Sequence, residues 1–433
     1  MADVSDHVSD HVSDHKYDQD RSVAVAQGGL WAWINKRFPA ESFIRSQALE
    51  YYAPKNFNFW YFFGFIALVV LVIQLLTGIF LTMFYKPGAA TAFQSVNFIM
   101  REVDFGWLIR YIHSTGASAF FVVIYLHIYR GMLYGSYKAP RELLWLFGMI
   151  IYLALMGEAF MGYVLPWGNM SYWAAQVIIN IFGTVPLIGG GLVQWIRGDY
   201  GVSDATLNRF FALHVVAIPL ILLLLVVLHL VALRHSGSNN PDGVEIKAHK
   251  DAAGKPLDGI PFHPYYTVKD LVGICAFLTV FALVVFEMPT FNGLFLEPAN
   301  FTPADPVSTP ADIVPAWYFT PYYAILRSFP NKGIGALALL LAVVAYFFLP
   351  WLDRSPVKSI RYRGWIFKLF LGIFTVSFLA LMYLGRQSVT PSVVEISRVF
   401  LGGYFAFFVL MPFYSRIDPV KPVPDRVRFH AHE

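Results

Sequence analysis

The stretch RYIHSTGASAFFVVIYLHIYRG, residues 110–131, places His113 and His127 fourteen positions apart among aromatic, small and β-branched residues. Fourteen residues of α-helix rise about 21 Å and leave about 40° of rotation between the two ends, so both histidines face nearly the same way. A second stretch, HVVAIPLILLLLVVLH, begins at His214 and ends at His229. Because histidine is expensive inside a membrane helix, its presence there by default marks function. The two stretches predict two pairs of imidazoles at two depths.

The composition excludes a soluble globular domain. Of the 433 residues, 57% are hydrophobic and only 14% are charged, a balance that indicates a chain embedded in a bilayer. Cys275 is the single cysteine, so disulfides within the chain, cysteine zinc sites, cysteine-held iron–sulfur clusters and thioether haem attachment are excluded. Any cofactor must be held by other ligands.

Eight apolar stretches approach the roughly 20 residues needed to cross a bilayer. Lys and Arg gather in KAPRE (138–142), in Arg234–Lys269 and in DRSPVKSIRYR (353–363), all on one side of the membrane. By the positive-inside rule, both termini are expected in the cytoplasm or its matrix equivalent. The fold class predicted is an all-α integral membrane protein. The expected spans are about Phe59–Tyr85, Tyr111–Tyr134, Leu143–Trp167, Phe210–Leu233, Leu271–Met288, Ile334–Trp351, Trp365–Leu384 and Val393–Tyr414.

The chain divides into two groups of spans, the loops that connect them, and a segment at each end. Residues 1–27 contain three tandem VSDH copies and are expected to form a disordered polar tail. Residues 28–55 mix Trp, Ile and Phe with Lys and Arg, as an amphipathic helix on the membrane interface would. The other divisions are spans 1–4 (56–235), a cytoplasmic loop (236–269), spans 5–8 (270–415) with a proline-rich outer loop (288–330), and a C-terminal tail (416–433).

The four histidines are best explained as ligands of haem iron. One histidine alone could equally be a hydrogen-bonded packing residue, but four at matched depths on two parallel helices are much harder to explain in that way. Neutral imidazole is a common ligand of haem iron, and one histidine from each side leaves the iron no open axial position. Such a site suits electron transfer rather than oxygen binding.

Small and cationic residues near the histidines could complete such sites. Glycines could let flat rings approach the backbone. Arg110 and Arg130 each lie three residues from a histidine, one near each membrane face, where they could pair with haem propionates. Each arginine is equally well explained as an anchor whose charged end reaches the interface. The glycines are Gly64 and Gly78 on the first span, again fourteen apart, and Gly116 and Gly131 beside the histidines.

Several longer strings carry a resemblance to a known family. Together with the four histidines, they make the chain similar to cytochrome b of the quinol:cytochrome c reductase, respiratory complex III, from about Trp31 to Tyr414. The strings are GYVLPWGNMSYWAA (162–175), ATLNRFFALH (205–214), GSNNP (237–241), PFHPYYTVKD (261–270) and PAWYFTPYYAILRS (315–328).

The resemblance implies a di-haem four-helix bundle of spans 1–4 and a Q cycle that helps to move protons across the membrane. Quinol would give one electron to a Rieske iron–sulfur protein and the other, through the two haems, to a quinone at an inner site. Cytochrome c1 and a second copy of the complex are further implied partners, and no nucleic acid is expected.

The same resemblance implies roles for individual residues. Haem bL would lie between His113 and His214, and haem bH between His127 and His229. The outer site, which oxidises quinol, would draw on Gly162, Gly168, Trp317, Tyr318 and Tyr323. The inner site, which reduces quinone, would draw on Ser238, Lys269 and Asp270.

The first departure from the family's pattern is a spacing. His214 and His229 are fifteen residues apart, where the respiratory family usually has fourteen. On a regular α-helix, His229 should therefore point about 60° past the direction of His214, whereas a spacing of fourteen would leave it about 40° short of that direction. Pro219 lies between the two and could absorb part of that difference by kinking the helix. Both histidines therefore remain expected ligands.

The second departure is Ala316, in PAWY, where the family commonly has an acidic residue. Quinol oxidation must release protons outward, and alanine cannot accept one. Glu158, an intramembrane acid that the family does not usually show, is hypothesised to take over part of this role. Replacing it with Gln should then slow quinol oxidation severalfold. The alternative is a glutamate that is hydrogen-bonded in a polar contact between helices.

The third departure is Arg234, which stands where the family often has a quinone-binding histidine, with His235 next to it. Either residue could contact the quinone, or Arg234 could serve a haem propionate. Asp270 is the firmer choice for proton delivery, because a carboxylate at the inner membrane edge can exchange with water. It could equally be a helix-capping residue.

Two other functions share some of these features. A di-haem anchor for a peripheral dehydrogenase is one, although the long outer loop and PAWY argue against it. A haem-free transporter that relays protons through His, Glu158 and Asp270 is the other. Two b-type haems in the purified chain would exclude the transporter. The polar tail favours a multi-pass protein of the bacterial inner (plasma) membrane, with the mitochondrial inner membrane as the alternative.

Overall fold

The structure is a computed structural model that describes residues 29–39, 41, 42, 45 and 50–428. The predicted polar tail, residues 1–27, lies outside the described residues. The described part contains eight helical segments long and apolar enough to cross a membrane, as predicted. They are α4 (Phe62–Thr82), α6 (Gly106–Tyr134), α7 (Glu142–Val164), α10–η3–α11 (Asp204–Ala212, Leu213–Ala217 and Ile218–Ser236), α12 (Thr267–Glu287), α14–η8–α15 (Lys332–Val344, Ala345–Phe348 and Leu349–Leu352), α16 (Trp365–Leu384) and α17 (Pro391–Val409).

The spans have the length and the end signals that membrane helices need. The 21 residues of α4 make a helix about 31 Å long, which matches the apolar core of a bilayer. Gly135 ends α6 in the left-handed backbone region, with φ 61°, which glycine adopts without strain. The side chains of Asn331 and Thr390 accept hydrogen bonds from backbone N–H groups in the first turns of α14 and α17. These signals fix where the polypeptide leaves the membrane.

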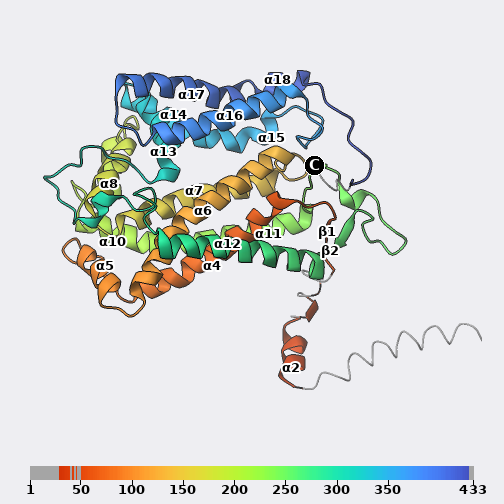
Figure 1. Cartoon of the computed structure of the whole chain (residues 1–433), viewed down its shortest axis with the longest axis horizontal. Coiled ribbons are helices and arrows are strands. Elements are labelled where there is room, and N and C mark those ends of the chain that lie inside the picture. Colours follow the sequence, from red (N-terminus) through yellow and green to blue (C-terminus); the bar gives the residue numbers. More distant parts are fainter. Residues whose placement is uncertain (1–28, 40, 43–44, 46–49, 429–433) are drawn as a thin grey trace, which may run out of the picture.

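Figure 1 shows the spans in two groups that lie side by side. In the first group, α4 packs on α6 and α7 packs on α11, while α12 contacts both α4 and α6. In the second group, drawn in blue, α16 packs on α17, and α13 (Thr320–Arg327) contacts α14, α16 and α17. One continuous cluster of buried apolar side chains, including Phe121, Trp317 and Phe374, joins the groups. The two groups therefore share a single core.

Much of the apolar surface of the spans faces outward. Only 6% of the most apolar window of Asp204–Ser236 is buried inside the chain. Leu220, Leu224 and Val231 on α11 are all exposed. An aqueous protein would not tolerate such a surface, whereas the apolar core of a bilayer covers it.

The connections at the end that carries α5 and α8 are folded rather than extended (Figure 1). The predicted outer loop, residues 288–330, contains three short helices, and an isolated β-bridge joins its Pro303 to Gly168 at the start of α8. This pairing holds the loop against the four-helix group. The short elements of this end are α5 (Ala92–Arg101), α8 (Asn169–Phe182), α9 (Gly189–Arg197), η6 (Pro298–Phe301), η7 (Trp317–Phe319) and α13.

The opposite end carries a small antiparallel sheet of β1 (Tyr52–Pro54) and β2 (Gly259–Pro261). An interfacial helix is expected over residues 28–55, and the position of this segment at the membrane interface stays a prediction. Helix α2 covers Leu30–Arg37, with the large apolar side chain of Trp33 exposed, and the segment ends in a strand. The backbone of β1 pairs with β2, which belongs to the inner loop. The remaining short elements are η2 (Phe59–Tyr61), η4 (Ile246–Ala248), η5 (Phe262–Tyr266) and α18 (Met411–Ile417).

A charged cluster also joins the two helix groups at this end. Arg141, just before α7, donates two hydrogen bonds of 2.7 and 2.9 Å to the carboxylate of Glu245. Lys358, between α15 and α16, donates a third of 2.6 Å to the same carboxylate. Glu245 thus links the inner loop to both groups.

The span that holds His214 and His229 is not a regular α-helix. Residues Leu213–Ala217 form a π-helical turn, in which the N–H of Ile218 donates to the carbonyl oxygen of Leu213, five residues earlier. Pro219 follows directly and disfavours α-helical geometry in the turn before it, because it has no N–H and its ring crowds the carbonyl four residues back. The irregularity expected near Pro219 is present, as a π-turn just before it.

Candidate haem and quinone sites

The outer histidine pair brings α6 and the π-turn together. The ring centres of His113 and His214 lie 6.3 Å apart, with the ring planes 87° to each other. Nδ1 of His113 lies 2.9 Å from the hydroxyl of Thr77, and Nδ1 of His214 lies 2.9 Å from the backbone oxygen of Glu158. These contacts orient both rings and leave the Nε2 atoms for another ligand.

The inner pair repeats the arrangement at the other depth. The ring centres of His127 and His229 lie 6.4 Å apart, with the planes at 65°. Two imidazoles on opposite sides of one iron, with iron–nitrogen bonds of roughly 2 Å and about 1.1 Å from nitrogen to ring centre, have centres about 6.2 Å apart. Both pairs therefore have the ring separation and the donor type that a haem iron held between two imidazoles would need.

Four glycines face the four histidine rings, and a Cβ at any of them would approach ring carbon Cε1. Two of the glycines lie on α4 and two on α7, and each couple is fourteen residues apart, the spacing of His113 and His127. Gly148 was not among the predicted residues, although its spacing from Gly162 is the signal that could have found it. The added Cβ would lie 3.1 Å from Cε1 of His127 at Gly64, 3.4 Å from that of His113 at Gly78, and 3.2 Å from that of His229 at Gly148; at Gly162 it would collide with the ring of His214.

Gly116 and Gly131 lie against side chains of neighbouring helices, and their expected role beside a haem ring stays a prediction. A Cβ at Gly116 would collide with the side-chain amide of Gln74, and one at Gly131 would lie 2.7 Å from the ring of Trp145. Neither glycine faces a histidine ring. They allow α6 to pack closely on α4 and α7, and Gln74 also donates a 3.0 Å hydrogen bond to the backbone oxygen of His113.

The two arginines predicted to pair with haem propionates lie near the outer and the inner histidine pair. Arg110 stands one turn before His113 at the outer end of α6. Arg130 donates a 3.2 Å hydrogen bond to Ser136 and lies 4.8 Å from the ring centre of Tyr61. Its Nε is buried and makes no hydrogen bond within the described part of the chain. A buried guanidinium N–H without a partner fits a site that an anionic group completes.

The PAWY segment packs against α6. The indole N–H of Trp317 donates a 3.1 Å hydrogen bond to the hydroxyl of Ser118, and the ring of Tyr318 stacks on Phe121 with centres 3.9 Å apart. Tyr323, one turn into α13, lies under the guanidinium of Arg327 at 5.2 Å. The segment is therefore fixed on the same helix that carries His113 and His127.

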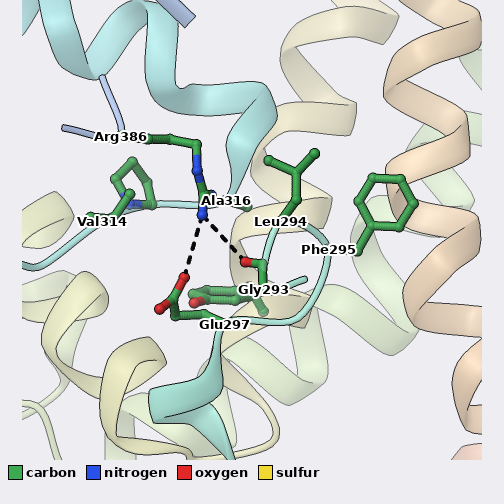
Figure 2. A pocket seen from close by; sticks show the side chains of 9 residues that line it. Gly293, Leu294, Phe295, Glu297, Val314, Ala316 and Arg386 are labelled. Carbon is green, nitrogen blue, oxygen red and sulfur yellow. Dashed lines mark hydrogen bonds and ion pairs between the residues drawn. The ribbon is translucent and has the colours of Figure 1, made fainter. Parts of the chain in front are cut away.

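A small pocket lies beside this segment. Its lining includes Ala316, Phe295, Glu297 and Arg386, and Figure 2 shows the Arg386 side chain reaching between the Glu297 carboxylate and the backbone oxygen of Gly293. Gly168 lies behind the loop, where an added Cβ would meet Asn300. No sequence signal singled out Glu297 or Arg386, because only the folding of the long loop brings them together.

Glu158 does not line this pocket. Its Oε1 lies 3.0 Å from Nδ1 of His214, and its Oε2 is buried without a hydrogen-bond partner among the described residues. The hypothesis that Glu158 receives protons from quinol stays a prediction. The polar contact given as the alternative is present, and it is made to a histidine.

Two of the residues predicted for the inner site, Ser238 and Arg234, lie against one tyrosine. The Tyr51 hydroxyl is 2.9 Å from Oγ of Ser238, and the Tyr51 ring lies 3.9 Å from the guanidinium of Arg234. Lys269 donates a 2.6 Å hydrogen bond to the backbone oxygen of Phe57. Tyr51 was missed because it lies before the first span, in a segment interpreted only as interfacial.

Asp270 lies in the first turn of α12, but it does not cap that helix. The N-cap residue is Tyr266, and no side chain makes a capping hydrogen bond there. The capping alternative for Asp270 is therefore excluded. The carboxylate stays next to Lys269 at the inner end of α12.

Comparisons with known proteins give the family. Residues 48–237 match the family model described as cytochrome b/b6/petB, and residues 303–405 match cytochrome b(C-terminal)/b6/petD. The chain is 57% identical over 404 residues to cytochrome b of Allochromatium vinosum, covering 92% of this chain and 97% of that relative. It is 48% identical over 397 residues to cytochrome b of Rickettsia prowazekii, covering 92% and 96%.

A solved structure described as hyperthermophilic respiratory complex III is similar over 90% of this chain and 99% of the matched chain, with a TM-score of 0.83 and 41% identity. The chain belongs to the cytochrome b/b6 family. Cytochrome b is the haem-binding, electron-transporting subunit of the quinol–cytochrome c reductase, complex III. The eight spans and the bacterial relatives fit a multi-pass protein of a bacterial inner membrane.

Proposed function

We propose that the chain holds two b-type haems, bL between His113 and His214 and bH between His127 and His229, and carries electrons through them across the membrane. The observation that carries the proposal is the ring separation of 6.3 Å in one pair and 6.4 Å in the other. Fourteen helical residues separate the two depths by about 21 Å. An apolar core of roughly 30 Å is too thick for one electron-transfer step, so two haems would divide the distance into shorter steps.

The residues around the rings would hold these groups. Each haem would carry one electron at a time. The glycines on α4 and α7 would give its flat ring space against the backbone. Arg110 and Arg130 would pair with propionates at the outer and inner depth. Thr77 and the Glu158 backbone fix the orientation of the outer histidines.

The two substrate sites would lie on opposite faces. At the outer site, quinol would bind beside Trp317, Tyr318 and Tyr323, as the resemblance implies. Gly162 and Gly168, also implied there, would act by close packing, Gly162 on His214 and Gly168 on Asn300. One electron would pass to a Rieske iron–sulfur protein and on to cytochrome c1, and the other to haem bL. The complex would work as a homodimer, as the resemblance implies.

At the inner site, quinone would be reduced between the end of the α11 span and the start of α12. Ser238, Arg234 and Tyr51 form one connected group, which would bind the quinone oxygen. Lys269 and Asp270 would supply protons from the cytoplasm. This orientation places both termini in the cytoplasm, in line with the Lys and Arg of the inner loops.

Spectroscopy of the purified complex tests the proposal. The reduced protein should show α-band absorption of b-type haem with about two haems per copy of this chain, and quinol should reduce them. His229→Leu should leave one haem, that of the outer pair. A colourless folded chain, or a His229→Leu variant that keeps both haems, would contradict the proposal.

A further inference from the structure

The pocket beside Ala316 contains a carboxylate of its own. Ala316 offers only a methyl group, but Glu297, from the loop after α12, lines the same pocket (Figure 2). Arg386, from the connection between α16 and α17, lies 3.8 Å from the Glu297 carboxylate and donates a 3.4 Å hydrogen bond to the backbone oxygen of Gly293. Three distant parts of the sequence thus place one acid where the PAWY segment lacks one.

Glu297 also has access to water. Its side chain is 27% exposed, so the carboxylate reaches both the pocket and the outer solvent. A group in this position can take a proton on one side and release it on the other. Glu158, in contrast, is held at His214 and does not line the pocket.

The surroundings of Glu297 suit proton transfer. Burial raises the pKa of the Glu297 carboxyl above its usual range, and the positive charge of Arg386 opposes this. A proton acceptor works best when its pKa is close to the working pH. The other titratable side chains that line the pocket with it are Tyr163, from α7, and Arg386.

We propose that Glu297 is the proton acceptor for quinol at the outer site, in place of the acid that Ala316 cannot supply. This inference rests on the proposed function. The O–H bond of one quinol hydroxyl breaks, and its proton forms a new O–H bond with the Glu297 carboxylate. The electron pair of that bond stays on the quinol oxygen, and the iron–sulfur protein and haem bL, the two oxidants already proposed, would each accept one electron. Glu297 then releases the proton to the outer water and can take up the proton of the second hydroxyl, which must also leave before quinone is formed.

The test uses the whole complex with four variants of this chain. Glu297→Gln should slow quinol oxidation about a hundredfold, at the lower end of the range that a positioned acid or base contributes. The wild-type rate should fall at low pH, as Glu297 becomes protonated, and Glu297→Gln should lose this inflection. Adding Ala316→Glu to Glu297→Gln should restore most of the rate. Glu287→Gln, an exposed acid just before the same loop, should behave as wild type.

The outcomes distinguish Glu297 from Glu158 as the proton acceptor, and they separate this inference from the proposed function. An unchanged rate and pH profile in Glu297→Gln would overturn the inference, and so would a slow variant that keeps its low-pH inflection and is not rescued by Ala316→Glu. Loss of the inflection in Glu158→Gln instead would move the role to Glu158. A wild-type complex whose haems are not reduced by quinol would reject the proposed function itself. The haem absorption spectrum of each variant shows whether it has folded.

Discussion

Single residues decide whether a flat ring fits between the helices. Gly148→Val would place side-chain carbons against His229, since even the first added carbon lies 3.2 Å from its Cε1. We expect this variant to hold about one haem per chain, with the outer haem kept, measured by haem absorbance against protein. Gly157→Ala, on the same helix, is the control, because its added carbon meets only Ile218 at 3.8 Å. Two haems in Gly148→Val would refute the assignment.

Glu158 allows a second test at this scale. The charge of a carboxylate 3.0 Å from Nδ1 would make His214 a stronger donor to the iron of the proposed outer haem and would lower the potential of that haem. Glu158→Gln should raise that potential by on the order of tens of millivolts. Haem binding should persist, because the backbone oxygen of residue 158 also lies 2.9 Å from Nδ1. A redox titration that finds both potentials unchanged would show that the carboxylate does not act on His214.

Some residues could be predicted from the sequence and others could not. The four histidines followed from spacing, because helical geometry converts spacing directly into depth and direction. Gly148 could have been found in the same way. Glu297 and Arg386 could not, because 89 residues separate their numbers and their contact depends on how two connections fold over the bundle.

At the scale of the element, the π-turn explains the fifteen-residue spacing. A π-turn accommodates one extra residue without adding the rotation of a regular helical step. The path from His214 to His229 therefore turns about as far as fourteen α-helical residues, which is the offset between His113 and His127. This matches the ring separations of 6.3 and 6.4 Å in the two pairs. Pro219 indicated an irregularity, but its type depends on backbone hydrogen bonds that the sequence does not show.

A deletion tests this explanation. Removing Val216 shortens the spacing to fourteen, and the π-turn can become a regular α-helical turn with the histidines in the same directions. We expect about two haems per chain in this variant. Inserting one alanine after Val216 should instead rotate His229 away by about 100° and leave one haem. If the deletion lost a haem and the insertion kept both, the π-turn would not be the compensating feature.

At the scale of the whole molecule, the bilayer made the spans easy to predict and left the connections uncertain. All eight spans were found from apolar length, since a membrane requires long runs with few charges. Strand β1 and the folded outer loop lie outside the predicted spans, where length and hydropathy give little guidance. The proposed function depends on both parts, because the spans would hold the haems and the connections would form the quinol pocket.

The two helix groups are also tied together by charge, and this contact has a pH dependence. Glu245 is partly buried, which alone would raise its pKa, but the hydrogen bonds and charges of Arg141 and Lys358 lower it to about 2. Because the folded pKa lies below the usual value, the contact should stabilise the fold fully at neutral pH and lose this effect as the pH falls from about 4.5 toward about 2. The carboxylate side chain is 40% exposed, so screening limits the contribution to about 1 kcal/mol.

Glu245→Gln should therefore lower the thermal unfolding temperature at pH 7 by about 1–2 °C, followed by loss of the haem absorption band. The difference from wild type should shrink below pH about 4.5, where the wild-type carboxylate begins to take up protons. Glu102→Gln, an exposed acid at the other end of the molecule, should unfold as wild type at every pH. A difference that grew as the pH fell would mean that Glu245 does not hold the inner connections through its negative charge.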